Sequence, residues 1–206
     1  MTLYPVVMPV HLPTKVNHNS PCPSYLKRGG LSGPEQSARL SQLAREALRV
    51  SADRSGVSLG ELLKDEEGRP CPDSGNYWSL SHKPGCVAAV VSRDRVGIDV
   101  EEMKPRTEPL FAYVAGDEEW ELMDRSWDTF FRYWTAKEAA LKIIGIGIGG
   151  LKACRVAAVP DEKHIVLDYR GDSFLVEQLR YRNHVIAVVK GDNEVEWVVL
   201  NEGPPE

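Results

Sequence analysis

The sequence lacks the features expected of a membrane, secreted or zinc-binding protein. It contains no run of roughly 18 apolar residues, the length that a membrane-spanning helix requires. Pro5, Pro9 and Pro13 interrupt the apolar residues near the start, which argues against a signal peptide. The four cysteines form no Cys-x-x-Cys pair and have no histidine at zinc spacing, so we expect reduced thiols. These absences predict a cytoplasmic protein with no membrane contact.

The sequence also has no excess of positive charge. Its net charge is −5, so its overall charge provides no basis for binding nucleic acid. The glycine-rich stretch GIGIGG at 145–150 lacks the Gly-Lys-Ser/Thr of a P-loop and follows a helical pattern, which indicates a helix stop and a turn. The 206 residues, 42% of them hydrophobic, suit one large domain or two small ones.

Several segments have the periodicity of regular secondary structure. A helix is predicted over 33–50, with Pro34 in its first turn and apolar residues at helical spacing. A second begins at Ser126 as N-cap and ends before Gly145. A short helix is expected at 116–123, and most of the remaining C-terminal part is interpreted as strands.

Two segments of the chain share one layout. Residues 86–100 and 184–200 each read as an apolar strand, a polar turn and a second strand. The repeat favours an α+β fold with two similar halves, each a small antiparallel sheet packed on a long helix. We place the boundary between 1–103 and 104–206. Two unrelated hairpins are the alternative, because this layout is common.

Asp99 and Glu101 lie at the end of an apolar strand-like run. Side chains at i and i+2 of a strand point to the same face, so the two carboxylates lie side by side and repel each other. A solvated strand end is one explanation. A cation bound between the carboxylates is the other, because it cancels their repulsion.

The second long helix carries charged residues on one face. Glu138 and Lys142 are four residues apart on this face, with Lys137 beside it. An ordinary exposed ion pair is one interpretation. In the other, Asp99, Glu101 and Glu138 converge on a hard cation such as Mg²⁺, which prefers oxygen ligands. The lysines would then suit a phosphorylated substrate and metal-assisted phosphoryl transfer.

These residues resemble the paired signature of the 4′-phosphopantetheinyl transferases. VGIDVE at 96–101 resembles the family's Gly-(Ile/Val)-Asp-x-Glu. WTAKEAALK at 134–142 resembles Trp-x-x-Lys-Glu-(Ala/Ser)-x-x-Lys. EGRP at 67–70 resembles Gly-(Lys/Arg)-Pro, and SLSHKPG at 79–85 resembles Asn-x-Ser-His-Ser. The four matches occur in the family's order, and the length resembles the larger, monomeric, surfactin-synthetase-activating class, in which two halves form a pseudo-dimer.

The resemblance implies a reaction and a set of site residues. Coenzyme A would donate its 4′-phosphopantetheine arm to a serine of an apo carrier protein, releasing adenosine 3′,5′-bisphosphate. The C-terminal half would carry the metal and the catalytic helix, and the N-terminal half the adenine and 3′-phosphate side. The implied ligands of Mg²⁺, or of Mn²⁺, are Asp99, Glu101 and Glu138. The residues implied to contact coenzyme A are Arg39, Arg69, Pro70, Ser81, His82, Lys137 and Lys142.

The residue that removes the proton of the carrier serine stays open. Glu119 lies where the family often has an acidic residue near the metal, and a shift of one residue would exchange it with Glu118. Glu138 and a metal-bound water are the other candidates. Two positions depart from the family pattern, since Ser79 replaces asparagine and Lys83 replaces serine. The first 33 residues cannot be aligned, so Lys27 and Arg28 are only candidate phosphate contacts.

The implied partner is an apo acyl or peptidyl carrier protein of lipid, polyketide or nonribosomal peptide biosynthesis. Because this chain is itself acidic, docking would need a local basic or apolar patch, such as Arg45, Arg49 and Arg54 or the apolar residues near 110–125. A solvated helix face is the alternative for the arginines. Two alternatives are a catalytically inactive coenzyme A-binding homologue and a structural protein whose acids solvate a strand end.

Overall fold

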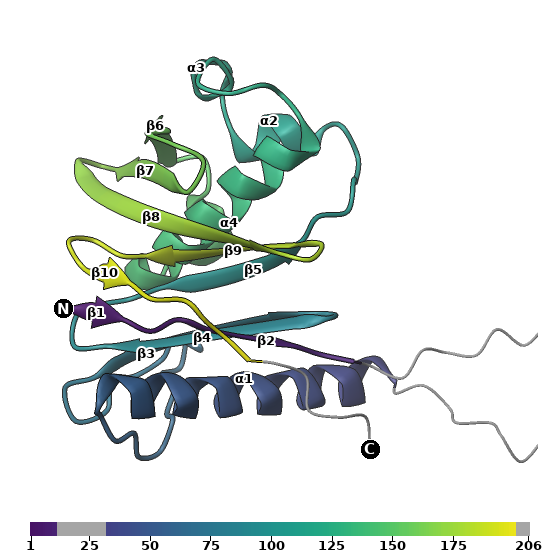
Figure 1. Ribbon diagram of the computed structural model, residues 1–206. Helices are drawn as coiled ribbons and strands as arrows, with labels where there is room; N and C mark the ends of the chain where they lie inside the picture. Colours follow the sequence, from purple (N-terminus) through teal and green to yellow (C-terminus); the bar gives the residue numbers. More distant parts are fainter. Residues whose placement is uncertain (12–31, 201–206) are drawn as a thin grey trace, which may run out of the picture.

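The computed structural model describes residues 1–11 and 32–200, and these form two β-sheets enclosed by two long helices (Figure 1). Lys27 and Arg28 lie outside the described residues. In chain order the elements are β1 (Thr2–Leu3), β2 (Val6–Pro9), α1 (Gly33–Ser55), β3 (Tyr77–Lys83), β4 (Cys86–Ser92), β5 (Ile98–Glu102), α2 (Leu110–Val114), α3 (Asp117–Trp120), α4 (Trp127–Ile144), the 3₁₀ helix η2 (Gly147–Gly150), β6 (Cys154–Ala158), β7 (His164–Tyr169), β8 (Asp172–Tyr181), β9 (His184–Val189), β10 (Glu194–Val195) and β11 (Val198–Val199).

The two sheets form the centre of the molecule. The first has the strand order β11-β2-β4-β3 and the second β5-β9-β8-β7-β6, while β1 pairs with β10. In Figure 1, α1 lies along the first sheet at the bottom, and α4 lies against the second sheet. The layers therefore follow the order α1, first sheet, second sheet, α4.

Alternating side chains of the central strands explain this order. In β4, Val87 and Ala89 pack with α1, whereas Ala88 and Val90 pack with apolar residues of the second sheet. In β9, the residues at 186 and 188 face the first sheet, and those at 185, 187 and 189 face α4. Because both faces of each strand are covered, both sequences are apolar throughout.

The predicted α+β fold is confirmed, since each of the two larger sheets packs on a long helix and their strand pairs are antiparallel except for the parallel pairing of β11 with β2. The predicted helices correspond to α1, α3 and α4. Ser126 accepts a hydrogen bond from the Thr129 N–H as the N-cap of α4, and Gly145 follows the helix with φ 81°. The glycine-rich stretch begins with this helix stop and continues into η2.

The two segments with a shared layout, 86–100 and 184–200, connect the two sheets instead of forming hairpins. The first runs from β4 in the first sheet to β5 in the second, and the other from β9 in the second to β11 in the first. Sheet pairing therefore crosses the division between residues 103 and 104 in both directions. That division stays a prediction. Within the described residues, no helix is both long and apolar enough to cross a membrane.

Candidate active site

Three elements meet where the two sheets join: β3 at the edge of the first, β5 at the edge of the second, and α4. Ile98 and Val100 of β5 pack between the sheets, so the alternating Asp99 and Glu101 point away from that core, toward the α4 side. Gly97 allows the close approach of α4, because a Cβ there would lie 1.9 Å from the carbonyl oxygen of Ala139.

Asp99 is held by one neighbour from each of the other two elements. Its Oδ1 accepts a hydrogen bond from the Ser81 hydroxyl of β3 at 2.8 Å and lies 3.0 Å from the Lys142 ammonium of α4. Lys142 also donates to the carbonyl oxygen of Ile98 at 2.6 Å. The second oxygen of Asp99 is buried and has no hydrogen-bond partner among the described residues.

Glu138 contributes a second buried oxygen of the same kind. Its Oε1 has no hydrogen-bond partner in the part of the chain that the structure describes. Burial, followed by the negative charge of Asp99, raises the pKa of Glu138 to about 7, although the nearby Lys142 opposes this shift. The side chain is therefore close to half ionised near neutral pH.

Glu101 differs from these two carboxylates because both its oxygens are paired. Its Oε1 lies 2.9 Å from the Lys83 ammonium and its Oε2 lies 3.3 Å from the guanidinium of Arg106. Burial raises the pKa of Glu101, and the hydrogen bond from Lys83 acts in the opposite direction.

The carboxylates of Asp99, Glu101 and Glu138 do not converge on one metal-binding position. Among residues 1–11 and 32–200, no three His, Cys, Asp or Glu side chains stand close enough together to hold a metal ion. Asp99 and Glu138 nevertheless fit a divalent cation, because each has a buried oxygen that lacks a partner. Glu101 would fit only after releasing a basic partner.

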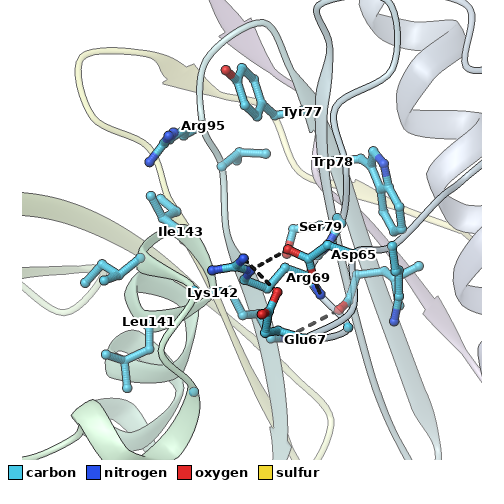
Figure 2. A pocket seen from close by; sticks show the side chains of 18 of the residues that line it. Asp65, Glu67, Arg69, Tyr77, Trp78, Ser79, Arg95, Leu141, Lys142 and Ile143 are labelled. Carbon is cyan, nitrogen blue, oxygen red and sulfur yellow. Dashed lines mark hydrogen bonds and ion pairs between the residues drawn. The ribbon is translucent and has the colours of Figure 1, made fainter.

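A cavity of about 590 Å³ extends from α4 to the loop before β3 (Figure 2). Figure 2 shows Arg69 joined to Asp65 and Glu67, and its Nε lies 2.6 Å from Asp65 Oδ2. Predicted site residues from both parts of the sequence line this cavity: Arg69, Pro70, Glu138 and Lys142. The structure thus brings the EGRP segment and the catalytic helix to one cavity.

His82 and Arg39 lie outside this cavity lining. The His82 Nε2 atom is 3.2 Å from the Ser41 hydroxyl of α1, and the ring is half-buried. Burial, followed by the positive charges of Lys142 and Lys83, lowers the pKa of His82. Arg39 is exposed on α1.

Lys137 and Glu119 form a separate buried cluster. The Lys137 ammonium lies 2.6 Å from Glu119 Oε1 and 2.6 Å from the carbonyl oxygen of Val114. Glu119 also accepts the N–H groups of Gly116 and Val156, both at 2.8 Å. Lys137 and Glu138 point to different neighbours because adjacent helix residues differ by about 100°. Glu118 is exposed and pairs with Arg155.

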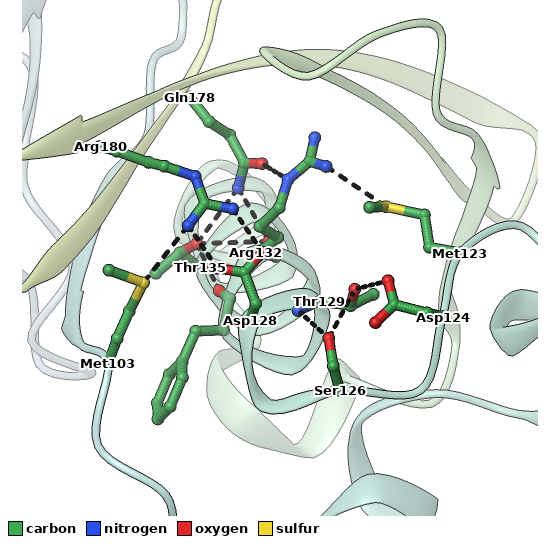
Figure 3. A network of polar contacts seen from close by, with 11 residues as sticks. Met103, Met123, Asp124, Ser126, Asp128, Thr129, Arg132, Thr135, Gln178 and Arg180 are labelled. Atoms are coloured by element: carbon green, nitrogen blue, oxygen red, sulfur yellow. Dashed lines mark hydrogen bonds and ion pairs between the residues drawn. The ribbon is translucent and has the colours of Figure 1, made fainter.

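A polar network fixes α4 against the second sheet (Figure 3). The Arg132 Nε donates to Gln178 Oε1 of β8 at 2.9 Å, and the Gln178 amide donates back to the Arg132 carbonyl oxygen at 2.9 Å. Nearby, Asp128 in the first turn pairs with Arg180 of β8. These contacts hold the start of the helix whose later turns carry Glu138 and Lys142.

The sequence interpretation missed the basic partners of Glu101. A signal for Lys83 was present, because Ser81 and Lys83 are two residues apart on β3, as Asp99 and Glu101 are on β5. Matching the two strands side by side would have paired Ser81 with Asp99 and Lys83 with Glu101. No comparable signal existed for Arg106, which lies in a loop.

Comparison with known proteins agrees with the family inferred from the motifs. Residues 95–189 match the family described as the 4′-phosphopantetheinyl transferase superfamily. This segment contains every predicted site residue of β5, α3 and α4.

Three curated relatives illustrate the similarity. The 4′-phosphopantetheinyl transferase HetI of Nostoc sp. is 34% identical over 52% of each chain. A putative 4′-phosphopantetheinyl transferase of Haemophilus influenzae is 30% identical over 70% of this chain and 66% of its own. The 4′-phosphopantetheinyl transferase AcpT of Salmonella typhi is 32% identical over 53% of this chain and 60% of its own. This chain spans about half to two thirds of these relatives. The chain is thus similar to the 4′-phosphopantetheinyl transferase superfamily over residues 95–189.

Proposed function

We propose that this protein transfers the 4′-phosphopantetheine arm of coenzyme A to a serine hydroxyl of an apo acyl or peptidyl carrier protein, releasing adenosine 3′,5′-bisphosphate. One observation carries the proposal. Asp99 and Glu138 each have a buried carboxylate oxygen without a hydrogen-bond partner among the described residues, Asp99 also pairs with the Lys142 ammonium, and Glu138 and Lys142 line a cavity of about 590 Å³. Unpaired buried oxygens beside an ammonium suit a metal-bound pyrophosphate.

The metal would be Mg²⁺, or Mn²⁺ in its place, held by Asp99, Glu138 and Glu101. When bound, such an ion neutralises the pyrophosphate and so stabilises the charge that develops during transfer. Lys142 would place its positive charge near the phosphate oxygens from the same side. Its two backbone contacts, to the Ile98 and Leu80 carbonyl oxygens, keep the ammonium beside Asp99.

The nucleotide part of coenzyme A would occupy the cavity. Arg69 and Pro70 would border the adenine, because both line this cavity. Ser81 and His82 would contact the 3′-phosphate region, with Lys137 left in its ion pair with Glu119. Arg39 is a candidate for a more distant phosphate contact from α1.

Glu138 is our choice for the residue that accepts the serine proton. A base needs a free lone pair within reach of the proton, and Glu138 meets the first condition, because one of its carboxylate oxygens can bind the metal while the other keeps its lone pairs. Glu119 does not, because its oxygens accept hydrogen bonds from Lys137, Val156 and Gly116. The serine oxygen would bond to the phosphorus that carries pantetheine. The P–O bond to the adenosine-side phosphate would break, and Glu138 would take the proton.

Mass spectrometry tests this function. Several apo carrier proteins are incubated with coenzyme A, Mg²⁺ and this protein, and each modified carrier should gain one phosphopantetheine group. A parallel sample with a chelator should show no gain. If no carrier gains mass while calorimetry detects tight coenzyme A binding, the protein is an inactive homologue and the proposal is wrong.

A monomer acting in the cytoplasm remains our prediction.

A further inference from the structure

The carboxylate cluster is already neutralised by the chain's own basic groups. Asp99 pairs with Lys142, and Glu101 pairs with both Lys83 and Arg106. With Glu138, three carboxylates face three basic side chains. The formal charges therefore balance, before any metal ion binds, when Glu138 is ionised.

Lys83 and Ser81 occupy equivalent positions along β3. Both side chains point to the same side of the strand, and each contacts one acid of the adjacent β5. Ser81 donates a neutral hydroxyl to Asp99 at 2.8 Å, whereas Lys83 brings a positive charge to Glu101 at 2.9 Å. Ser81 and Lys142 share one oxygen of Asp99, which leaves the other without a partner among the described residues, whereas Lys83 and Arg106 occupy both oxygens of Glu101.

Lys83 is the removable member of the basic set. Lys142 is fixed by two backbone carbonyl oxygens, so it stays beside Asp99 whatever the acid binds. Lys83 reaches Glu101 from the end of β3, with 35% of its side chain exposed. A lysine has a long flexible stem and can return its ammonium to water. Arg106 contacts the other oxygen at the longer distance of 3.3 Å.

We propose that Lys83 competes with the divalent cation for Glu101, so that the ion completes its ligand set by displacing this ammonium. The inference rests on the proposed function, because it concerns the same metal site. It explains why two acids have free oxygens while the third is paired. It predicts that Lys83 weakens metal binding and that a neutral residue at position 83 strengthens it.

The test uses Mn²⁺ alone as the probe, with the full chain and no coenzyme A. The dissociation constant is measured from the paramagnetic resonance signal of free Mn²⁺ for the native protein, Lys83→Ser and Lys83→Met. We expect both variants to bind Mn²⁺ about tenfold more tightly, since tenfold corresponds to about 1.4 kcal/mol, close to one charge-assisted hydrogen bond. Met keeps the apolar stem, so it serves if Ser disturbs the strand.

Two control variants separate competition from a general charge effect. Lys83→Arg keeps the positive charge and should bind Mn²⁺ as the native protein does. Lys104→Ser removes one positive charge from an exposed loop just after β5, and it should also leave the affinity unchanged. An equal gain in Lys104→Ser and Lys83→Ser would mean that net charge, and not competition at Glu101, controls the affinity, and would overturn the inference.

The result is separable from the proposed function. Suppose the native protein modifies a carrier, but Lys83→Ser and Lys83→Met bind Mn²⁺ no more tightly than it does. Lys83 then does not compete with the cation for Glu101, and the proposed function stands. If no variant binds Mn²⁺ and no carrier is modified, the proposed function fails as well. A weaker affinity in both variants would also overturn the inference, because Lys83 would then assist metal binding.

Discussion

Asp99 and Glu138 are set apart from Glu101 by a buried oxygen that accepts no hydrogen bond from the described residues. An unpaired buried acceptor costs free energy, and for Glu138 that cost appears as a pKa of about 7. Functional sites commonly contain buried polar groups that lack a hydrogen-bond partner. Glu101, whose oxygens are both paired, would bind the metal only after releasing a basic partner.

Replacing Glu138 by glutamine tests the role of its charge. We expect the rate of carrier modification to fall by about 100-fold or more, the usual size of general-base and charge effects. The melting temperature near pH 7 should not fall. Since the folded pKa is about 7 and the unfolded value 4.5, the native glutamate loses stability as the pH rises through this interval, and glutamine does not.

Glu102→Gln is the matched control, because it neutralises the neighbouring acid of β5. Its rate should stay close to that of the native protein. Comparable losses in Glu102→Gln and Glu138→Gln would contradict a specific role for Glu138.

His82 predicts a pH dependence of stability. Its pKa is lowered by burial and by two lysines, so the unfolded chain binds a proton near pH 6.5 that the folded protein binds only at lower pH. Stability should therefore rise as the pH increases from the folded pKa toward 6.5. Urea unfolding of the native protein and His82→Gln, from about pH 5 to about pH 8, measures this difference. Parallel curves for the two proteins would show that His82 contributes nothing.

At the scale of elements, α4 uses its two sides for different purposes. One side presents Glu138 and Lys142 to the cavity. Another buries Lys137, whose ion pair with Glu119 connects α4 to α3, and Glu119 in turn bonds to the first residues of β6 at Val156. The resemblance implied a role in substrate binding or catalysis for Lys137 and Glu119, and this role stays a prediction, while their contacts favour a structural one.

Lys137→Met should lower the free energy of unfolding by about 3–5 kcal/mol, because it leaves the Glu119 charge buried without its partner. The double variant Lys137→Met/Glu119→Gln should lose much less, since the glutamine is neutral. Denaturant unfolding of the three proteins gives these values. If the double variant is stable yet modifies no carrier, the pair takes part in the chemistry and our structural assignment is wrong.

At the scale of the whole molecule, the two sheets share one core. Leu3 and Val90 of the first half pack in the same cluster as Ile98 and Ile186 of the second sheet. The strands β10 and β11 also return from the second half to pair with β1 and β2. We therefore expect the two halves to unfold as one cooperative unit.

Ile186→Ala tests this coupling, because Ile186 is fully buried between the sheets. It should lower the free energy of unfolding by about 2–5 kcal/mol while preserving a single transition. Circular dichroism and tryptophan fluorescence should give the same midpoint. Two separate midpoints would show that the halves unfold independently.

Much of the fold was predictable because its signals are local. The caps of α4 at Ser126 and Gly145 depend only on neighbouring residues, and the structure has both. The sequence did not predict that the chain passes from β4 in the first sheet to β5 in the second. The strand-turn-strand pattern shared by residues 86–100 and 184–200 also describes a hairpin. Which strand lies beside β5 depends on packing between distant segments.

The sequence by itself determined which acids share a face. Two-residue spacing sets Asp99 beside Glu101, and four-residue spacing sets Glu138 beside Lys142, through the geometry of a strand and a helix. Only the tertiary structure decided which partners these charges meet. Lys83 reaches Glu101, and Lys137 reaches Glu119 instead of the cavity, because contacts between distant residues depend on how the sheets and α4 pack.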